Sequence, residues 1–379
     1  MQFLQNYRWV FVLFSITVAP ESTAQVMDWT KRTVNNIFND TASSERPKFI
    51  AYPTVAYAPE TQWEFGISAL YVFYAQRDTS NRLSELSAFT FLTLESQYGL
   101  WLDHALYSDK SAWFFLGRLR YQRFPLIYYG IGPDAPDEEL AQVDANSIAI
   151  RERVLRKVSG SLYLGVELDY QRLSGVSFNR LSDEPFPLPA GSQGSANFGV
   201  GLGLVYDNRH NVLNVREGFF GETGFLHYDD AWGSDFSFTH YFLDARYFYP
   251  VTKGQVLAYQ LYGANMAGDV PFNQLALMGG ESLMRGYYLG RYRDNTLIAT
   301  QVEYRFLPFP FSRRWGAAAF LSAGGVAPSP REINLGDWVV AGGAGVRFLI
   351  FPSKDIYTRL DVAFTEEGPG YYFFIGEAF

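Results

Sequence analysis

From about Lys48 onward, hydrophobic residues recur at every second position in segments of strand length. Between residues 355 and 364, apolar side chains alternate with a second set that includes Arg359 and Asp361. The same alternation recurs between residues 297 and 306. A period of two indicates a β-strand, because successive side chains of a strand point to opposite faces of the sheet. Charges on one face and apolar residues on the other favour a sheet with water inside and lipid outside, as in a transmembrane β-barrel.

Sixteen segments of this kind follow one another along the chain. The pattern places them at residues 48–58, 63–75, 84–95, 98–107, 112–123, 145–157, 160–173, 195–207, 218–229, 236–249, 255–267, 296–307, 315–326, 338–350, 355–365 and 370–379. An even number of strands is typical of bacterial outer-membrane barrels. We therefore predict an all-β fold, a 16-stranded antiparallel transmembrane β-barrel that spans residues 47–379.

The connections between the predicted strands alternate between short and long. If the first strand runs outward, the periplasmic turns include residues 108–111, 158–159, 251–254 and 351–354, all of them short. The long connections then lie outside the cell, at residues 124–144, 173–194 and 268–295. Short periplasmic turns and long external loops are typical of these barrels, and a soluble β-sandwich does not order its loops in this way.

The N-terminus has a different pattern. Residues 1–24 are predicted to be a secretory signal peptide, because Arg8 is followed by an apolar run over residues 9–19 and small residues precede Gln25. The alternative for this stretch is a short buried strand. Residues 25–46 form a short periplasmic segment whose residues 26–40 are compatible with an amphipathic helix. This segment is either a periplasmic tail or a cover across the barrel mouth.

Composition supports a membrane barrel and argues against a spanning helix, a nucleic-acid partner and cysteine chemistry. Aromatic residues make up 18% of the chain, which is expected where strands end in aromatic girdles. No apolar run of 18 residues occurs after the N-terminus, so a spanning helix is not expected. The net charge of -8 argues against nucleic acid as a partner. The absence of cysteine excludes disulfides, thiol chemistry and a lipid anchor on cysteine. We expect a multi-pass protein of the bacterial outer membrane, surrounded by outer-membrane lipids.

One external connection carries a specific motif. Residues 268–295 contain an Arg-Gly-Tyr triplet, weak evidence alone, with a glycine pair five residues before its arginine, in the loop after the eleventh strand. The motif residues are Gly279, Gly280, Met284, Arg285, Gly286 and Tyr287. This loop resembles the signature loop of the BamA-type outer-membrane assembly and translocation superfamily, also called the bacterial surface antigen family. The resemblance implies an extracellular loop that folds into the lumen and docks Arg285 on the inner wall.

The resemblance extends over the rest of the barrel. Further matching positions are residues 206–209 with Asn214, Gly218, Phe220 and Glu222, residues 244–250, and Gly343, Gly345, Arg347 and Asp361. The end of the chain resembles the sorting signal that the barrel-assembly machinery reads, with Tyr371, Phe373, Ile375 and Phe379 as its hydrophobic positions. The resemblance therefore implies that this machinery inserts the protein.

Two features depart from the family pattern. Family members usually carry periplasmic POTRA domains ahead of the barrel, and residues 25–46 are too few for even one. The chain therefore resembles the subgroup that lacks them. In addition, Ser322 stands where the family commonly has an aspartate that faces the loop arginine. The usual partner of Arg285 is thus replaced.

Charge and alternation suggest new partners for Arg285. A desolvated, unpaired arginine costs several kcal/mol, so a fixed anionic or carbonyl group is needed. Glu303 is our first candidate and Asp361 the second, because both are predicted to face inward near the loop; Ser322 is the third position considered. Gly286 would permit a close approach to the wall, and Tyr287 would pack beside it. The alternative is that Arg285 is a solvated loop residue that faces outside.

Other charged residues are also predicted to face the lumen. They are Arg118, Arg120, Glu167, Asp169, Asp244, Arg246, Arg347 and Arg359. Polar lumen residues are routine in large barrels, so a wet wall explains them without a special role. Their mixed signs argue against a strongly ion-selective porin.

These features lead to two hypotheses on function. The first is a barrel that assists insertion or translocation of proteins or lipids at the outer membrane, with its lumen plugged by residues 268–295 and with periplasmic or outer-membrane protein partners. In the resembled family the seam between the first and last strands opens; Pro53 and residues 368–370 fit a weak seam here but also fit ordinary turns. The alternative is a passive or structural outer-membrane channel.

Enzymatic chemistry is not expected. The histidines are His104, His210, His227 and His240, and no Gly-x-Ser-x-Gly elbow accompanies them. No spacing of His, Asp or Glu indicates a metal site. The sequence thus predicts no catalytic residue, no metal and no cofactor.

Overall fold

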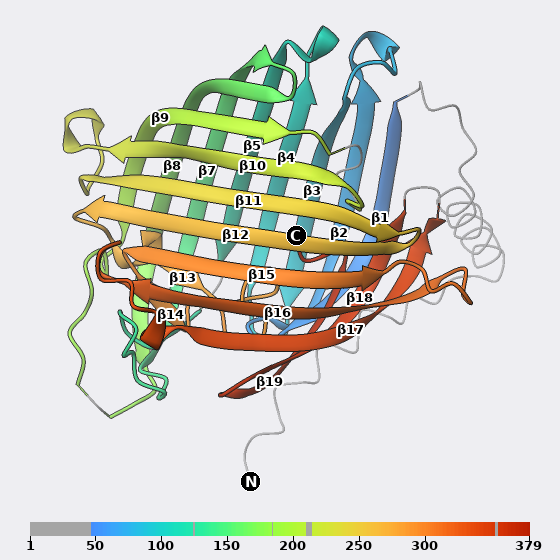
Figure 1. Cartoon of the computed structure of the whole chain (residues 1–379). Coiled ribbons are helices and arrows are strands. Elements are labelled where there is room, and N and C mark those ends of the chain that lie inside the picture. Colours follow the sequence, from blue (N-terminus) through green and yellow to red (C-terminus); the bar gives the residue numbers. More distant parts are fainter. Residues whose placement is uncertain (1–46, 124–125, 184, 210–213, 353–354) are drawn as a thin grey trace, which may run out of the picture.

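The computed structural model describes residues 47–123, 126–183, 185–209, 214–352 and 355–379. The strands form one antiparallel sheet that closes on itself as a barrel (Figure 1). This sheet has seventeen strands, but β6 (Leu126–Tyr128) is a short piece that pairs only with β7, so sixteen strands form the wall. The predicted 16-stranded antiparallel barrel is therefore confirmed.

The wall strands follow each other around the barrel in chain order. They are β1 (Lys48–Ala58), β2 (Gln62–Tyr74), β3 (Leu83–Thr93), β4 (Tyr98–Tyr107), β5 (Trp113–Arg123), β7 (Ala141–Ser159), β8 (Leu162–Arg180), β9 (Ser195–Asp207), β10 (Gly218–Tyr228), β11 (Phe238–Thr252), β12 (Gln255–Gly268), β15 (Thr296–Phe306), β16 (Trp315–Ala327), β17 (Val339–Phe351), β18 (Ile356–Thr365) and β19 (Gly368–Ile375). Within the described ranges, five single turns of 3-10 helix interrupt the connections: Ala75–Arg77, Asp109–Ser111, Asp230–Trp232, Phe272–Gln274 and Leu335–Asp337. No helix in the described ranges is long and apolar enough to span a membrane.

Two parts of the wall differ from the strands that alternation predicts. β7 and β8 continue beyond the predicted residues 145 and 173, because their ladder runs on past a bulge between Asp144 and Asn146 to the pair Ala141 and Arg180. The last strand ends at Ile375, four residues early, because Gly376 has a φ of +96° and turns the chain away from the sheet. Residues 1–24 and 25–46, predicted as signal peptide and periplasmic segment, lie outside the described residues.

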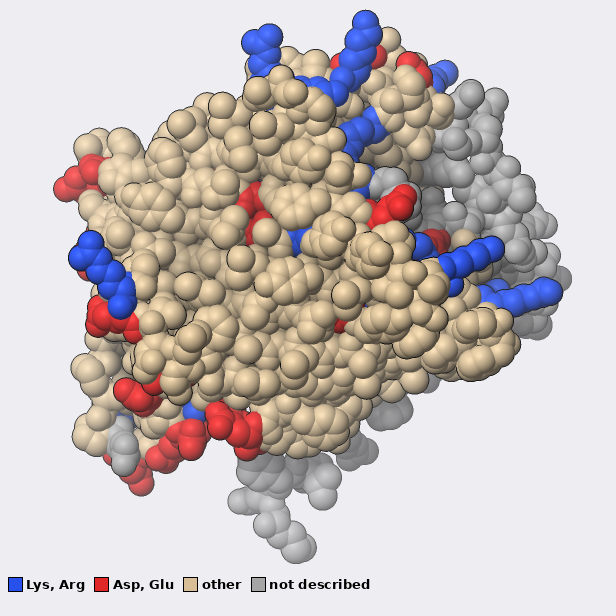
Figure 2. All heavy atoms as spheres, in the orientation of Figure 1, with Lys and Arg blue, Asp and Glu red and all other residues tan. Residues whose placement is uncertain are grey.

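The two faces of the wall have different chemistry. On β18, Arg359 and Asp361 are buried inside the barrel, whereas Leu360 and Phe364 are 46% and 60% exposed on the outside. Figure 2 shows an outer face with few charged side chains across its middle and more at its two ends. This distribution is that of a barrel with an apolar belt between two polar rims.

The seam between the first and last strands is the weakest join in the wall. In the part of the chain that the structure describes, Tyr57 opposite Phe373 is the one register pair between β1 and β19. By contrast, β1 pairs with β2 along its whole length, from Lys48 to Ala58. Most of β1 thus has a ladder on one side only, so its free edge offers unpaired backbone groups.

The connection between β12 and β15, residues 269–295, folds back against the inner wall. It contains a small two-stranded ribbon of β13 (Ala276–Met278) and β14 (Tyr292–Asp294), drawn inside the barrel in Figure 1. Apolar side chains of this connection pack in one buried cluster with residues of β12, β15, β16 and β17. They include Met278, Met284, Tyr287 and Tyr292. We call residues 269–295 the inner loop.

Candidate functional site

Glycines set the path of the inner loop. Gly279, Gly280 and Gly286 have φ values of +116°, +103° and +113°, a region that favours glycine. A Cβ on Gly286 would lie 2.5 Å from Thr365 Cγ2 on the wall. The backbone N–H of Gly280 donates to the carbonyl of Tyr287 at 3.0 Å, which closes the turn. The turn therefore holds Arg285 at a fixed point close to the wall.

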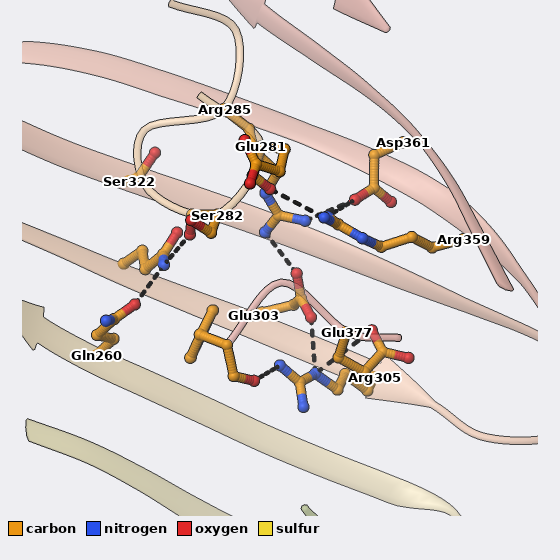
Figure 3. Close-up of polar contacts among 12 residues, drawn as sticks. Gln260, Glu281, Ser282, Arg285, Glu303, Arg305, Ser322, Arg359, Asp361 and Glu377 are labelled. Carbon is orange, nitrogen blue, oxygen red and sulfur yellow. Dashed lines mark hydrogen bonds and ion pairs between the residues drawn. The ribbon is translucent and has the colours of Figure 1, made fainter. Parts of the chain in front are cut away.

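The guanidinium of Arg285 is fully buried and bridges two strands. Its Nη1 donates to Asp361 Oδ2 on β18 at 2.7 Å, and its Nη2 donates to Glu303 Oε2 on β15 at 2.5 Å (Figure 3). Its Cζ also lies 3.5 Å from the ring centre of Phe320 on β16. Ionic hydrogen bonds and a cation–π contact thus hold one side chain against three strands.

Three further arginines surround the same carboxylates. Arg305 Nε donates to the second oxygen of Glu303 at 2.7 Å. Asp361 accepts from Arg347 at 2.5 Å and from Arg359 at 2.9 Å. We call this group the closed cluster: Arg285, Arg305, Arg347, Arg359, Glu303, Asp361 and Glu377, to which Arg347 Nε donates at 2.9 Å. Four guanidinium groups meet three carboxylates, and each side chain is at most 5% exposed.

Burial on this scale makes the closed cluster sensitive to the loss of any member. A charge removed from water is tolerated only while its partners remain in place. Loss of Glu303 would leave Arg285 and Arg305 without this shared partner, and loss of Asp361 would do the same for Arg285, Arg347 and Arg359. Arg285 of the inner loop is therefore one of the positive charges that neutralise the buried carboxylates of the wall.

Hydrogen bonds from wall side chains and to one of them hold the loop backbone on both sides of Arg285. The N–H of Gly286 donates to Tyr372 Oη of β19 at 2.9 Å. Gln301 Nε2 donates to the carbonyl of Ser282 at 2.8 Å, and Arg359 Nη2 donates to that of Glu281 at 3.0 Å. These bonds fix the turn against β15, β18 and β19.

Ser322 has a different neighbour. Its hydroxyl donates to the carbonyl of Ala341 on β17 at 3.2 Å, while Glu303 and Asp361 take the hydrogen bonds of Arg285. Figure 3 draws Ser322 apart from the guanidinium. The structure thus brings Arg285 together with the first two candidate partners and leaves Ser322 to the sheet.

Sequence reasoning did not single out Phe320, Tyr372 or Glu377. Phe320 lies two residues before Ser322, so alternation alone would have placed both on the inner face. Tyr372 lies between the outward positions Tyr371 and Phe373, so alternation would also have placed its side chain on the inner face. Glu377 follows the end of β19, where strand alternation no longer applies.

The hydrophobic positions of the predicted sorting signal lie in two places. Tyr371, Phe373 and Ile375 share the parity of the outer face of β19, and Tyr371 is half-exposed. Phe379 instead turns inside, where its backbone oxygen accepts from Arg305 Nη2 at 2.9 Å and its ring lies 6.3 Å from that of Phe248. Their role as a sorting signal stays a prediction.

The outer part of the inner loop binds the neighbouring loops. The N–H of Leu289 donates to Glu60 Oε1, between β1 and β2, at 2.8 Å. Burial, with a contribution from Glu281, raises the pKa of Glu60 to about 7. Arg291 forms ion pairs with Asp137 and Glu367. The inner loop is thus bound at two places, at Arg285 and again at residues 289–291.

Space remains in the lumen beside the inner loop. A cavity of about 510 Å³ is lined by Glu60, Glu281 and Arg293 and by apolar side chains that include Phe89 and Phe272. No group of three or more His, Asp or Glu side chains in the described ranges has the arrangement of a metal site. The chemistry of the site is that of ion pairs and packing.

Comparisons with known proteins agree with this geometry. The model of the Omp85 superfamily domain matches residues 103–378. Among solved structures, BamA from Haemophilus ducreyi lacking POTRA domains 1–3 is similar with a TM-score of 0.57 and 12% identity, covering 94% of this chain and 78% of that chain. CdiB from Acinetobacter baumannii (TM-score 0.53, 10% identity) covers 93% and 67%, and CdiB from Escherichia coli (0.55, 10%) covers 93% and 70%. At these identities the likeness concerns the fold. No curated protein matches the chain significantly.

Proposed function

Because the chain belongs to the Omp85 superfamily, we propose that it assists insertion or translocation of proteins or lipids at the bacterial outer membrane, without covalent chemistry. The family assignment agrees with the resemblance inferred from the loop motif. In this proposal the inner loop plugs the lumen at rest, and Arg285 is the residue that locks it. The lipids of the outer membrane and protein partners at its periplasmic side act with the barrel.

The observation that carries the proposal is the docking of Arg285. A passive channel gains nothing from a buried arginine that bridges Glu303 and Asp361 across the lumen wall. Under this proposal the inner loop has two discrete states, the docked one held by Arg285 and a released one, and a gated barrel needs both.

The seam supplies the second support. Among the described residues, only Tyr57 and Phe373 pair between β1 and β19, so the free edge of β1 has the backbone groups that an incoming strand would bind. An opening there would cost few hydrogen bonds. Insertion of a client strand at this edge would restore the ladder.

Single-channel conductance in planar bilayers tests the lock. We expect low, flickering current from the wild-type protein and large, steady current from Arg285→Ala, because release of the loop opens the lumen. Arg172→Ala, a change at an exposed arginine of β8, is the control and should behave as wild type. Large, steady current from all three proteins would contradict the plug and favour a passive channel.

A crosslink tests the seam. The chain has no cysteine, so Tyr57→Cys with Phe373→Cys creates one defined pair. We expect liposomes that carry the reduced protein to accelerate assembly of an unfolded outer-membrane porin, and the oxidised protein to lose this effect. Assembly at the same rate with and without the protein would contradict the insertion activity.

A further inference from the structure

A second group of arginines lies in the lumen, away from the closed cluster. A cavity of about 510 Å³ lies between β3, β4, β5, β7, β10 and β11. Its lining includes six arginines, Arg118, Arg120, Arg151, Arg153, Arg209 and Arg246, which we call the open cluster. Three carboxylates also line it, those of Glu85, Asp103 and Glu222. Six guanidinium groups against three carboxylates leave three positive charges on the cavity surface.

Three buried acids outside the cavity lining, Glu167, Asp207 and Asp244, balance these three charges, and Asp207 binds Arg209 at 3.0 Å. Arg151 binds Glu167 at 2.6 Å, and Arg246 binds Asp244 at 2.6 Å. The side chains of Glu167 and Asp244 are 0% and 6% exposed and do not line the cavity. The buried acids therefore hold Arg151 and Arg246 through Nε and Nη2, and Nη1 of each has no hydrogen bond to the described residues although both side chains line the cavity.

Arg118 is different from the rest of the open cluster. Its side chain is exposed in the lumen, and none of its donors binds a polar group of the described residues. On β4 it faces Asp103 in register, but Arg120 binds both oxygens of Asp103, at 2.7 and 2.9 Å. On β7 it faces Arg151, and like charges in opposed positions destabilise a sheet. An anion between Arg118 and Arg151 would remove this repulsion.

We propose that the open cluster is a binding site for a phosphate group. A phosphate has several oxygens that accept the paired N–H donors of arginine, and arginine is the side chain whose planar fork fits it. Arg118 supplies unoccupied donors, while Arg151 and Arg246 are held in place by buried carboxylates. The phosphate comes either free or as part of a phosphorylated headgroup; both share this chemistry. The site is independent of the lock at Arg285.

Titration calorimetry of the detergent-solubilised full chain tests the site. Sodium phosphate is titrated at constant ionic strength, with sodium chloride as the reference titration. We expect saturable binding of one phosphate by the wild-type protein and affinity about tenfold weaker, or worse, in Arg118→Gln. Arg172→Gln is the matched control, an exposed arginine outside the cavity, and should bind as wild type. No saturable heat in the wild-type protein, or equal affinity in Arg118→Gln, would overturn the proposal.

A second variant protects the test against misfolding. Arg118→Lys keeps the charge and loses the fork, so it should fold and bind phosphate several-fold more weakly than wild type. Wild-type affinity in Arg118→Lys together with wild-type affinity in Arg118→Gln overturns the role of Arg118. Heat-dependent gel migration checks that each variant forms a barrel.

A separate titration tests whether the phosphate is free or belongs to a lipid headgroup. Dihexanoyl phosphatidic acid, used below its micelle concentration, is compared with inorganic phosphate on the wild-type protein and Arg118→Gln. Tighter binding of the lipid that depends on Arg118 supports a headgroup, and equal affinities support free phosphate. Lipid binding that does not depend on Arg118, without binding of inorganic phosphate, contradicts the site.

Discussion

The barrel holds two arginine clusters that solve the same electrostatic problem in opposite ways. In the closed cluster, four arginines and three carboxylates are packed out of contact with water, and Arg285 of the inner loop joins them. In the open cluster, buried acids lie behind the arginines and Arg118 faces the lumen with no polar partner among the described residues. Arginine thus connects the inner loop to the wall in the closed cluster and offers accessible hydrogen-bond donors in the open cluster.

This difference shows that a lumen arginine can either stabilise the fold or remain available to bind a ligand. A buried arginine with carboxylates on two strands contributes to the docked state of the loop, and its removal leaves uncompensated charge. An arginine that faces water contributes little to the fold and keeps its hydrogen-bonding capacity for a ligand. The arrangement of the partner acids, more than the arginine itself, decides between the two roles.

The greatest loss of stability is expected from Glu303→Gln in the closed cluster. The change removes the carboxylate that binds Arg285 and Arg305 where neither has contact with water. We expect a loss of about 3–5 kcal/mol in the free energy of unfolding. Urea unfolding in detergent, followed by tryptophan fluorescence, measures this loss.

Asp103→Asn is the matched change in the open cluster. Asp103 binds Arg120, but its side chain is 46% exposed, so water can take over the hydrogen bonds. We expect a loss below about 1 kcal/mol. Equal losses in Glu303→Gln and Asp103→Asn would contradict the distinction between the clusters.

Glu60 differs from the acids of both clusters, because it is a buried acid bound by the N–H of Leu289 and not by an arginine. Burial raises its pKa from 4.5 to about 7, so it is protonated in the folded protein at pH 6 and ionised in the unfolded chain. Its contribution to stability is complete below pH 4.5 and is lost as the pH rises through 7. We expect Glu60→Gln to remove roughly 1–3 kcal/mol of the fall in stability between pH 5 and pH 8. An unchanged pH profile in this variant would show that Glu60 does not titrate in this range.

The smallest effect is expected from Arg118→Met. The change removes an arginine that faces Arg151 and has no polar partner in the described residues. In phosphate-free buffer, the free energy of unfolding should stay within about 0.5 kcal/mol of the wild-type value. A loss of several kcal/mol in the same urea experiment would mean that Arg118 has a structural role like that of Arg347.

The wall of the barrel was accessible from the sequence because alternation is a local signal. It gave the number of strands and the inward direction of side chains such as Glu303 and Arg359. The extra length of β7 and β8 was not accessible, because a strand ends where its partner stops pairing and not where its own pattern fades. The inward turn after Ile375 depends on the backbone of Gly376, a residue that also occurs inside strands here.

The site was accessible only in part. The motif and the resemblance pointed to Arg285, and alternation brought forward Glu303 and Asp361 as inward acids. Sequence gave no reason to join Arg305, Arg347 and Arg359 to the same carboxylates, because this depends on the depth at which neighbouring strands align. The sequence also did not predict that Arg118 has no polar partner. This depends on the alignment of neighbouring strands, because Asp103 lies opposite Arg118 but binds Arg120.

The last strand has two attachments one residue apart. Tyr372 points inside and accepts the hydrogen bond from Gly286, while Phe373 forms the pair with Tyr57 that closes the barrel. The contact with the inner loop and the contact that closes the barrel are therefore separated by a single peptide unit. Under the proposed function, coupling between the two contacts would be reciprocal, so a partner that widens the seam would weaken the docking of the loop by the same coupling free energy. The docked loop and the seam of this barrel thus meet at one peptide unit of β19.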